Sequence, residues 1–166
     1  MDTTALLTVT RCVANFPAMA DVTFVSRRDT AFREFPPASA QLAVVIPFYG
    51  DLTVWIRREA ESGWLFPTST RRSGETILEV ARRELWDSAR LVAGRLDLLG
   101  AIRSTIPKAA TSYIYMCDVR HVPWSYELPQ GVEEIGTFTR SPRPLASDWS
   151  EVVLDAALRA RRTGLR

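Results

Sequence analysis

The sequence predicts an α+β fold with a mixed or antiparallel sheet. Runs rich in β-branched residues lie on both sides of a central amphipathic segment, and a second amphipathic segment ends the chain, so strands and helices do not alternate regularly. The chain has 166 residues, of which 46% are hydrophobic and 24% are charged. This length fits one domain with a substantial core, and the composition is that of a globular protein.

Strands are expected in two groups, one before and one after the central helix. They share β-branched or aromatic residues and turn-forming neighbours, and they span residues 5–14, 22–28, 41–59, 63–67, 96–106, 111–122 and 132–140. The segment 41–59 is expected to be a hairpin, because Tyr49-Gly50-Asp51 separates two apolar runs. Pro36 and Pro37 make residues 30–40 a connector, and residues 67–74 are expected to be a loop without a glycine-rich phosphate motif.

Two segments have the periodicity of amphipathic helices. The first opens at Thr76, which can form a capping box with Glu79. Its expected buried stripe consists of Ile77, Leu78, Ala81 and Leu85. The second helix lies within residues 147–164, with Gly164 as its C-terminal cap. Its expected core face consists of Trp149, Val152, Val153, Ala156, Ala157 and Ala160.

The charged residues of the first helix admit two interpretations. At about 100° per residue, Ser88, Glu84 and Asp87 lie progressively further from the core stripe, at a half-shielded edge where carboxylates can share a hard cation such as Mg²⁺. In the alternative, the helix is an ordinary surface helix on which Glu79 and Arg83 pair at i, i+4. Periodicity alone favours the surface helix.

The spacing around this helix resembles the Nudix box, the hallmark of the Nudix superfamily. That box is Gly, five residues, Glu, seven residues, and then Arg-Glu-apolar-x-Glu-Glu-x-Gly-apolar. Here five residues separate Ser69 from Glu75, and seven separate Glu75 from Arg83. The residues that match are Glu75, Arg83, Glu84, Leu85 and Leu91, with Asp87 as a conservative change.

The flanking sequence extends the resemblance over roughly residues 41–157. In this superfamily a hairpin that ends in a basic residue and a Trp-x-x-Pro motif precede the box, and "LTVWIRRE" and "GWLFP" are similar to them. Downstream, "VEEIGTFTR" resembles the acidic strand that follows the box. The resemblance implies a Nudix-type mixed β-sheet sandwiched between helices in residues 41–166. Residues 1–40 are then a strand-rich extension packed on this domain.

The resemblance also implies an activity and a set of site residues. Nudix proteins are mostly pyrophosphohydrolases that cleave a nucleoside diphosphate linked to another group, with Mg²⁺ or Mn²⁺. By position, Glu84 and Asp87 are expected to be metal ligands, and Glu84 also a base. Glu133 is expected to be an auxiliary metal ligand and Glu134 an auxiliary base. Glu75 and Arg83 are expected to form the supporting ion pair.

Three departures make this a degenerate Nudix box. Ser88 replaces a glutamate and removes one negative charge from the site, so the metal is expected to bind weakly or not at all. Thr68 and Ser69 stand where two glycines usually let the backbone approach the metal and the substrate. Arg90 replaces a glycine, and because a positive φ is unfavourable for arginine, the helix is expected to end differently.

Residues outside the helix admit a ligand-binding and an ordinary explanation. Arg71, Arg72 and Lys108 either contact substrate phosphates or lie in solvated loops. Aromatic side chains of the hairpin either stack on a base or pack in the core; they are Phe48, Tyr49 and Trp55. Trp86 lies away from the core stripe, so we expect the N-terminal extension or a partner chain, as in a homodimer, to cover it. His121, the only histidine, is expected to be a loop residue.

The partners and the compartment follow from composition. The expected ligand is a nucleotide or another diphosphate-containing small molecule. A net charge of +2 gives no ground for a specific nucleic-acid or membrane partner. The N-terminal sequence is unlike a signal peptide and no apolar run is long enough to span a bilayer, so the expected location is the cytoplasm, with Cys12 and Cys117 as buried thiols.

Three functional hypotheses remain open at this point. The first is a Nudix hydrolase with weak or specialised activity. The second is a catalytically inactive Nudix-fold domain that binds nucleotides or another protein. The third is an unrelated α+β domain in which the box arose by chance.

Overall fold

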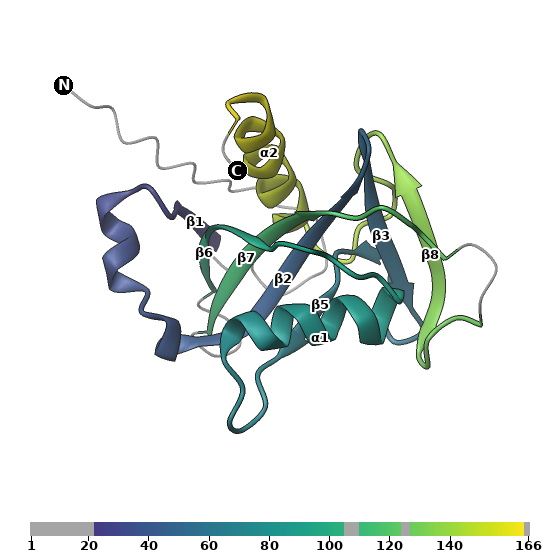
Figure 1. Cartoon of the computed structure of the whole chain (residues 1–166), viewed down its shortest axis with the longest axis horizontal. Coiled ribbons are helices and arrows are strands. Elements are labelled where there is room, and N and C mark those ends of the chain that lie inside the picture. The colour runs from purple at the N-terminus through teal and green to yellow at the C-terminus, as the bar shows by residue number, and fades with distance from the viewer. Residues whose placement is uncertain (1–21, 105–109, 124–126, 165–166) are drawn as a thin grey trace, which may run out of the picture.

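The computed structural model describes residues 22–104, 110–123 and 127–164. Within them, eight strands form one mixed sheet, in which β2 and β7 are parallel and every other pair is antiparallel (Figure 1). The strands are β1 (Val22–Ser26), β2 (Ala40–Tyr49), β3 (Leu52–Arg58), β4 (Trp64–Leu65), β5 (Thr68–Thr70), β6 (Asp97–Ser104), β7 (Ala110–Asp118) and β8 (Val132–Phe138). The helices are η1 (Thr30–Glu34), η2 (Pro37–Ser39), α1 (Ile77–Ala89) and α2 (Trp149–Arg162).

The central hairpin divides the sheet into two parts. Strands β2 and β3 pair only beside their turn, through Phe48 with Thr53 and Tyr49 with Leu52. Beyond that point β2 pairs with β5 and β7, whereas β3 pairs with β4 and β8. Figure 1 shows the two strands diverging from their common turn, with α1 lying across the end where they have separated. Helix α1 packs on β2 and β5 at this end.

Two hydrophobic clusters fill the space on either side of the sheet. One lies under α1 and the other under α2. Strand β2 contributes to both, because alternate side chains point to opposite faces: Ala43 and Val45 pack under α1, and Val44 and Ile46 under α2. The chain is therefore an α+β structure whose mixed sheet is sandwiched between helices, as predicted.

Most of the predicted elements are present. The hairpin turns at Gly50, whose φ of 60° suits glycine, and the strands expected near 22–28, 63–67, 96–106, 111–122 and 132–140 form β1, β4, β6, β7 and β8. The loop expected at 67–74 was partly wrong, because residues 68–70 form β5. The connector 30–40 contains the short helices η1 and η2. The strand expected at 5–14 lies outside the described residues.

The helix faces required two corrections. Leu78 is 38% exposed, and Val80 takes its place in the buried stripe of α1. In α2, Leu154 is buried, whereas Val152 and Ala156 are half-buried. In each helix the sheet covers a face rotated slightly from the expected one.

The remaining expectations concern the N-terminal extension, the two cysteines and membrane-spanning segments. Strand β1, from the expected extension, pairs with β6 along its whole length, so this part of residues 1–40 belongs to the sheet. Cys117 is buried, and burial raises the pKa of its thiol to about 12, while Cys12 lies outside the described residues. No helix in the described part of the chain is long and apolar enough to cross a membrane.

Candidate functional site

The first turn of α1 is held by a complete capping box. The Thr76 hydroxyl accepts a hydrogen bond from the Glu79 backbone N–H (3.3 Å), and the Glu79 carboxylate accepts one from the Thr76 backbone N–H (2.7 Å). These bonds satisfy donors that the helix geometry leaves without partners. Since Glu79 is used in this way, the alternative surface pair between Glu79 and Arg83 does not form.

Arg83 instead pairs with Glu75. Its Nε lies 2.7 Å from Glu75 Oε1 and its Nη2 lies 2.9 Å from Oε2. The same guanidinium donates to the Thr70 carbonyl (3.0 Å) and to the Ser69 hydroxyl (3.3 Å), which ties α1 to β5. Hydrogen bonds from Arg83 and from the Arg72 backbone N–H lower the pKa of Glu75 to about 2.

Glu84 points to a different set of groups. Its Oε1 accepts hydrogen bonds from Arg58 Nη2 (2.5 Å) and from the Thr68 backbone N–H (3.1 Å), and Arg58 also donates to the Thr68 carbonyl (3.1 Å). Glu84 is only 3% exposed, so it is buried and not half-shielded as expected. Burial raises the pKa of this carboxyl, while the Arg58 charge and the Thr68 N–H act in the opposite direction.

Ser88 and Asp87 also differ from the expected edge of the core. Ser88 is buried, and its hydroxyl donates to the Glu84 backbone carbonyl (2.8 Å). Asp87 has a side chain that is 46% exposed, with Oδ2 lying 3.8 Å from Arg83 Nη1. Arg58 of β3 and Thr68 of β5 contact Glu84, whereas the Asp87 side chain is largely in solvent.

The downstream acidic residues belong to another cluster. Glu133 and Glu134 of β8 both contact Arg57, at 3.1 and 2.9 Å. Arg57 also lies over the Trp64 ring, whose side chain packs in the cluster under α2, whereas the neighbouring Arg58 turns to α1. Glu133 and Glu134 therefore form ion pairs with Arg57, whereas Glu84 pairs with Arg58.

These residues do not fit a divalent cation. Among the described residues, no three Asp, Glu, His or Cys side chains are grouped so that they could hold a metal. Nor does the described part contain a buried polar side-chain atom without a hydrogen-bond partner that a cation would satisfy. Mg²⁺ and Mn²⁺ favour clustered oxygen ligands, but Glu84 already binds Arg58 and Thr68.

The expected substrate-binding residues have mixed surroundings. Arg71 donates from Nε to the Glu75 carbonyl (2.6 Å) and from Nη1 to the Pro37 carbonyl (3.3 Å), so it ties this loop to η2. Arg72 is exposed, and its backbone N–H donates to the Glu75 carboxylate (2.9 Å). Lys108 lies outside the described residues.

The hairpin aromatics are mainly core residues. Trp55 is fully buried and stacks on Phe66 with ring centroids 3.7 Å apart. Phe48 is also buried, whereas Tyr49 is 37% exposed. His121 lies in an exposed loop, as expected.

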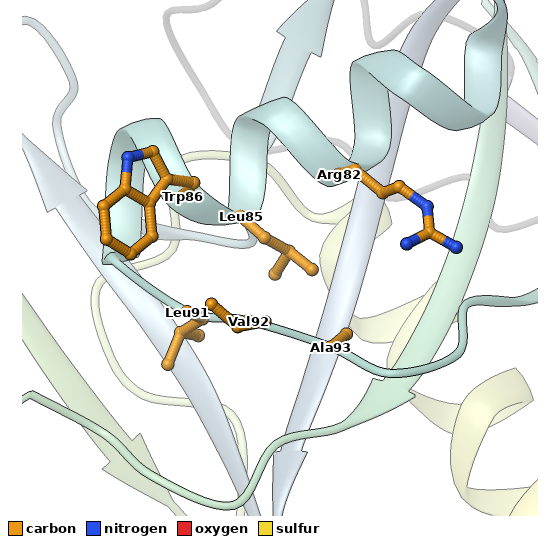
Figure 2. A pocket seen from close by; sticks show the side chains of 6 residues that line it. All are labelled: Arg82, Leu85, Trp86, Leu91, Val92 and Ala93. Carbon is orange, nitrogen blue, oxygen red and sulfur yellow. The ribbon is translucent and has the colours of Figure 1, made fainter.

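An exposed apolar face lies at the end of α1. Trp86 is 52% exposed and Val92 is 72% exposed. Figure 2 shows the side chains that border a hollow between α1 and the segment that follows it: Arg82, Leu85, Trp86, Leu91, Val92 and Ala93. The hollow has a volume of about 210 Å³. The Arg90 guanidinium lies 5.4 Å from the centre of the Trp86 ring.

The end of α1 corrects the expectation for Arg90. This residue adopts φ 52° and ψ 29°, the left-handed conformation that glycine favours at a helix end. Its side chain offsets part of the strain, because it contacts the Trp86 ring and donates to the Trp86 carbonyl (3.2 Å). The helix therefore ends where a glycine would end it.

Sequence reasoning missed Arg58 and the Thr68 backbone as parts of the site. A signal for Arg58 was present, because it is the basic residue at the end of the hairpin. No signal marked Thr68, since its contribution is made by backbone groups whose position depends on β5 pairing with β2.

Solved structures of known proteins share this fold. The pyrophosphohydrolase BsRppH of Bacillus subtilis is 17% identical and superimposes with a TM-score of 0.69, covering 87% of this chain and 92% of its own. A UDP-X diphosphatase is 16% identical with a TM-score of 0.62, covering 81% of this chain and 70% of its own. An ADP-ribose pyrophosphatase of Streptococcus suis is 15% identical with a TM-score of 0.55, covering 73% and 90%. By sequence, neither a family model nor a curated protein matches the chain.

The fold is therefore that of the Nudix hydrolases, as the box predicted. The shared architecture spans most of the chain, so the different fold expected under the third hypothesis is not observed. At these identities the likeness establishes the architecture, and the chemistry depends on the residues of this chain.

Proposed function

We propose that this chain binds a nucleotide or another diphosphate-containing small molecule without efficient metal-dependent hydrolysis. The observation that carries this proposal is the state of Glu84: the buried acid of the box is engaged by Arg58 and by the Thr68 N–H. Ser88 adds no second carboxylate beside it. An acid already neutralised by a guanidinium is a poor ligand for Mg²⁺ or Mn²⁺.

The ligand class comes from the structural neighbours and from basic residues of this chain. The similar structures are named as a pyrophosphohydrolase, a UDP-X diphosphatase and an ADP-ribose pyrophosphatase, and all of these names refer to phosphoanhydride compounds. Arg72, exposed in the loop before α1, is the residue we propose to contact a phosphate, together with Lys108. Arginine suits this role because its planar donors match phosphate oxygens.

Binding and turnover can be measured on the same samples. The protein is incubated with ADP-ribose, a UDP-sugar and a nucleoside triphosphate, each with Mg²⁺ and with Mn²⁺. We expect at least one compound to raise the melting temperature, with Arg72→Ala reducing the shift, and chromatography to show no consumption. Efficient cleavage that Glu84→Gln abolishes would contradict the proposal.

The second candidate is a pyrophosphohydrolase of low or specialised activity. The retention of Glu84 and Asp87 on a hydrolase fold favours it, with Glu133 and Glu134 as auxiliary groups. Ser88→Glu discriminates between the candidates, because it restores the missing carboxylate. A large gain in pyrophosphate cleavage would favour the hydrolase, whereas no gain is expected if Arg58 keeps Glu84 occupied.

We also propose that the exposed face around Trp86 is covered in a homodimer. A half-exposed tryptophan beside an exposed valine is unfavourable in water and typical of an interface. Light scattering is expected to give the mass of a dimer, and Trp86→Arg that of a monomer with an unchanged circular dichroism spectrum. A monomeric parent protein at about 100 μM, a concentration that would populate any dimer of micromolar affinity, would contradict this proposal.

A further inference from the structure

Arg58 occupies a defined position between three elements. It is the last residue of β3, and its Nη2 donates both to Glu84 of α1 (2.5 Å) and to the Thr68 carbonyl of β5 (3.1 Å). The Thr68 N–H completes the arrangement by donating to the same Glu84 oxygen (3.1 Å). The guanidinium therefore stands where a positive charge must stand if Glu84 is to be buried and ionised.

We infer that Arg58 is the resident cation of this site and takes the place of a divalent metal at Glu84. The inference does not depend on the proposed ligand, because it concerns the charge that the folded chain itself supplies.

Charge balance links Arg58 to Ser88. A divalent cation carries two positive charges and suits two or more carboxylates, whereas a guanidinium carries one. Glu84 supplies one negative charge, so the pair with Arg58 is neutral. A glutamate at position 88, which is 4% exposed in this fold, would bury a second carboxylate without a second positive charge. The serine is thus the residue that matches a singly charged cation, and its hydroxyl is satisfied by the Glu84 backbone carbonyl.

Arg58 and Glu84 differ in their exposure to solvent. The Arg58 side chain is 30% exposed, while the Glu84 side chain is 4% exposed. The neighbouring Arg57 pairs with Glu133 and Glu134 at side-chain exposures of 40% to 48%. Of these adjacent arginines, Arg58 is the one that neutralises a buried acid, and Arg57 serves as a matched control.

Binding of Mn²⁺ alone tests the inference, with the ion followed by electron paramagnetic resonance. Parent protein and Glu84→Gln are expected to bind Mn²⁺ equally weakly, because Glu84 is not available. Arg58→Gln is expected to bind Mn²⁺ at least about tenfold more tightly, and Arg58→Gln/Glu84→Gln to lose this gain. Arg57→Gln is expected to behave as the parent protein.

Two results would overturn the inference. One is a parent protein whose Mn²⁺ affinity falls about tenfold or more in Glu84→Gln, because Glu84 would then be a metal ligand beside Arg58. The other is a folded Arg58→Gln variant with no gain in Mn²⁺ affinity. Circular dichroism establishes folding, and the comparison of the parent with Glu84→Gln decides the matter independently of whether Arg58→Gln folds.

Ser88→Glu tests the charge balance separately. In the parent background it is expected to lower the melting temperature, and Mn²⁺ is not expected to restore it while Arg58 is present. In Arg58→Gln/Ser88→Glu, Mn²⁺ is expected to raise the melting temperature. Restoration by Mn²⁺ in the single variant Ser88→Glu would show that Arg58 does not hold the place of the metal.

Discussion

The two ion pairs of α1 involve adjacent helix residues but lie in different environments. Arg83 and Glu75 have side chains that are 17% and 20% exposed, whereas Glu84, paired with Arg58, is 4% exposed. The hydrogen bonds of Glu75 lower its pKa to about 2. The pKa of Glu84 is raised, because burial outweighs the opposing effect of its own hydrogen bonds and of the Arg58 charge. The first pair stabilises the ionised acid. The second compensates for burying one.

The two pairs therefore differ in what they do for the helix. Arg83 pairs with Glu75 and ties α1 to β5 through the Thr70 carbonyl. Glu84 is the buried acid of the second pair, and Arg58 supplies the positive charge beside it. The residues that tie α1 to β5 are therefore distinct from those that hold the buried acid.

The largest effect is expected from removing the cation at the buried acid. Arg58→Met leaves Glu84 without a partner at 3% exposure, and we expect the free energy of unfolding at pH 7 to fall by about 3 kcal/mol. Arg57→Met is the control, because its exposed pairs are expected to contribute less than about 1 kcal/mol. Urea unfolding measures both. Equal losses would remove the distinction between a buried and an exposed pair.

The matching double variant sharpens this result. In Arg58→Met/Glu84→Met the buried charge is gone together with its partner, so most of the loss is expected to be recovered. A double variant that is no more stable than Arg58→Met would show that the arginine stabilises the fold by packing and not by compensating Glu84.

A smaller loss is expected at the start of α1. Thr76→Ala removes the capping hydroxyl that accepts from Glu79, and it should cost about 1 kcal/mol. Thr76→Ser keeps the hydroxyl and should lose little, so comparing the two by urea unfolding isolates the cap. Identical stabilities would mean that the Glu75–Arg83 pair, and not the capping box, fixes this end of the helix.

The other end of α1 is expected to gain stability on substitution. Arg90→Gly relieves a left-handed backbone but loses the contact with Trp86, for a net gain of roughly 0.5–1 kcal/mol. Arg90→Ala also loses the contact and keeps the strain, so it should be less stable than both the parent and Arg90→Gly. Thermal unfolding of the three proteins measures this order, and it fails if glycine is no better than alanine.

The sequence predicted the parts of the fold that local chemistry determines. The start of α1 followed from Thr76 and Glu79, the hairpin turn from Gly50, and the identity of the fold from the spacing of the box residues. Each of these signals lies within a short stretch of chain, so no knowledge of distant contacts was needed.

What the sequence did not predict depends on distant contacts. Strand β5 has three residues and is stabilised by pairing with β2 and by bonds from Arg83, neither of which a local pattern reveals. Glu84 and Ser88 are buried in the folded chain, where α1 packs on β2 and β5, whereas helical periodicity placed them at a half-shielded edge. The partnership of Glu84 with Arg58 spans 26 positions and joins two elements that only the folded sheet brings together.

The smallest effect is expected in acid, where the acids of the two ion pairs, Glu75 before α1 and Glu84 within it, should respond with opposite signs. Because the folded pKa of Glu75 is about 2 and its ordinary value is 4.5, its contribution to stability is present above pH 4.5 and is lost as the pH falls towards 2. The stability difference between the parent and Glu75→Gln should therefore shrink over this range.

The folded pKa of Glu84 is raised, so its contribution to stability is complete below pH 4.5 and is lost as the pH rises above that value. Relative to Glu84→Gln, the parent should therefore become less stable as the pH rises from 4.5. Urea unfolding at several pH values measures both differences, and if they changed in the same direction, the two pairs of α1 would not be the opposites that their burial implies.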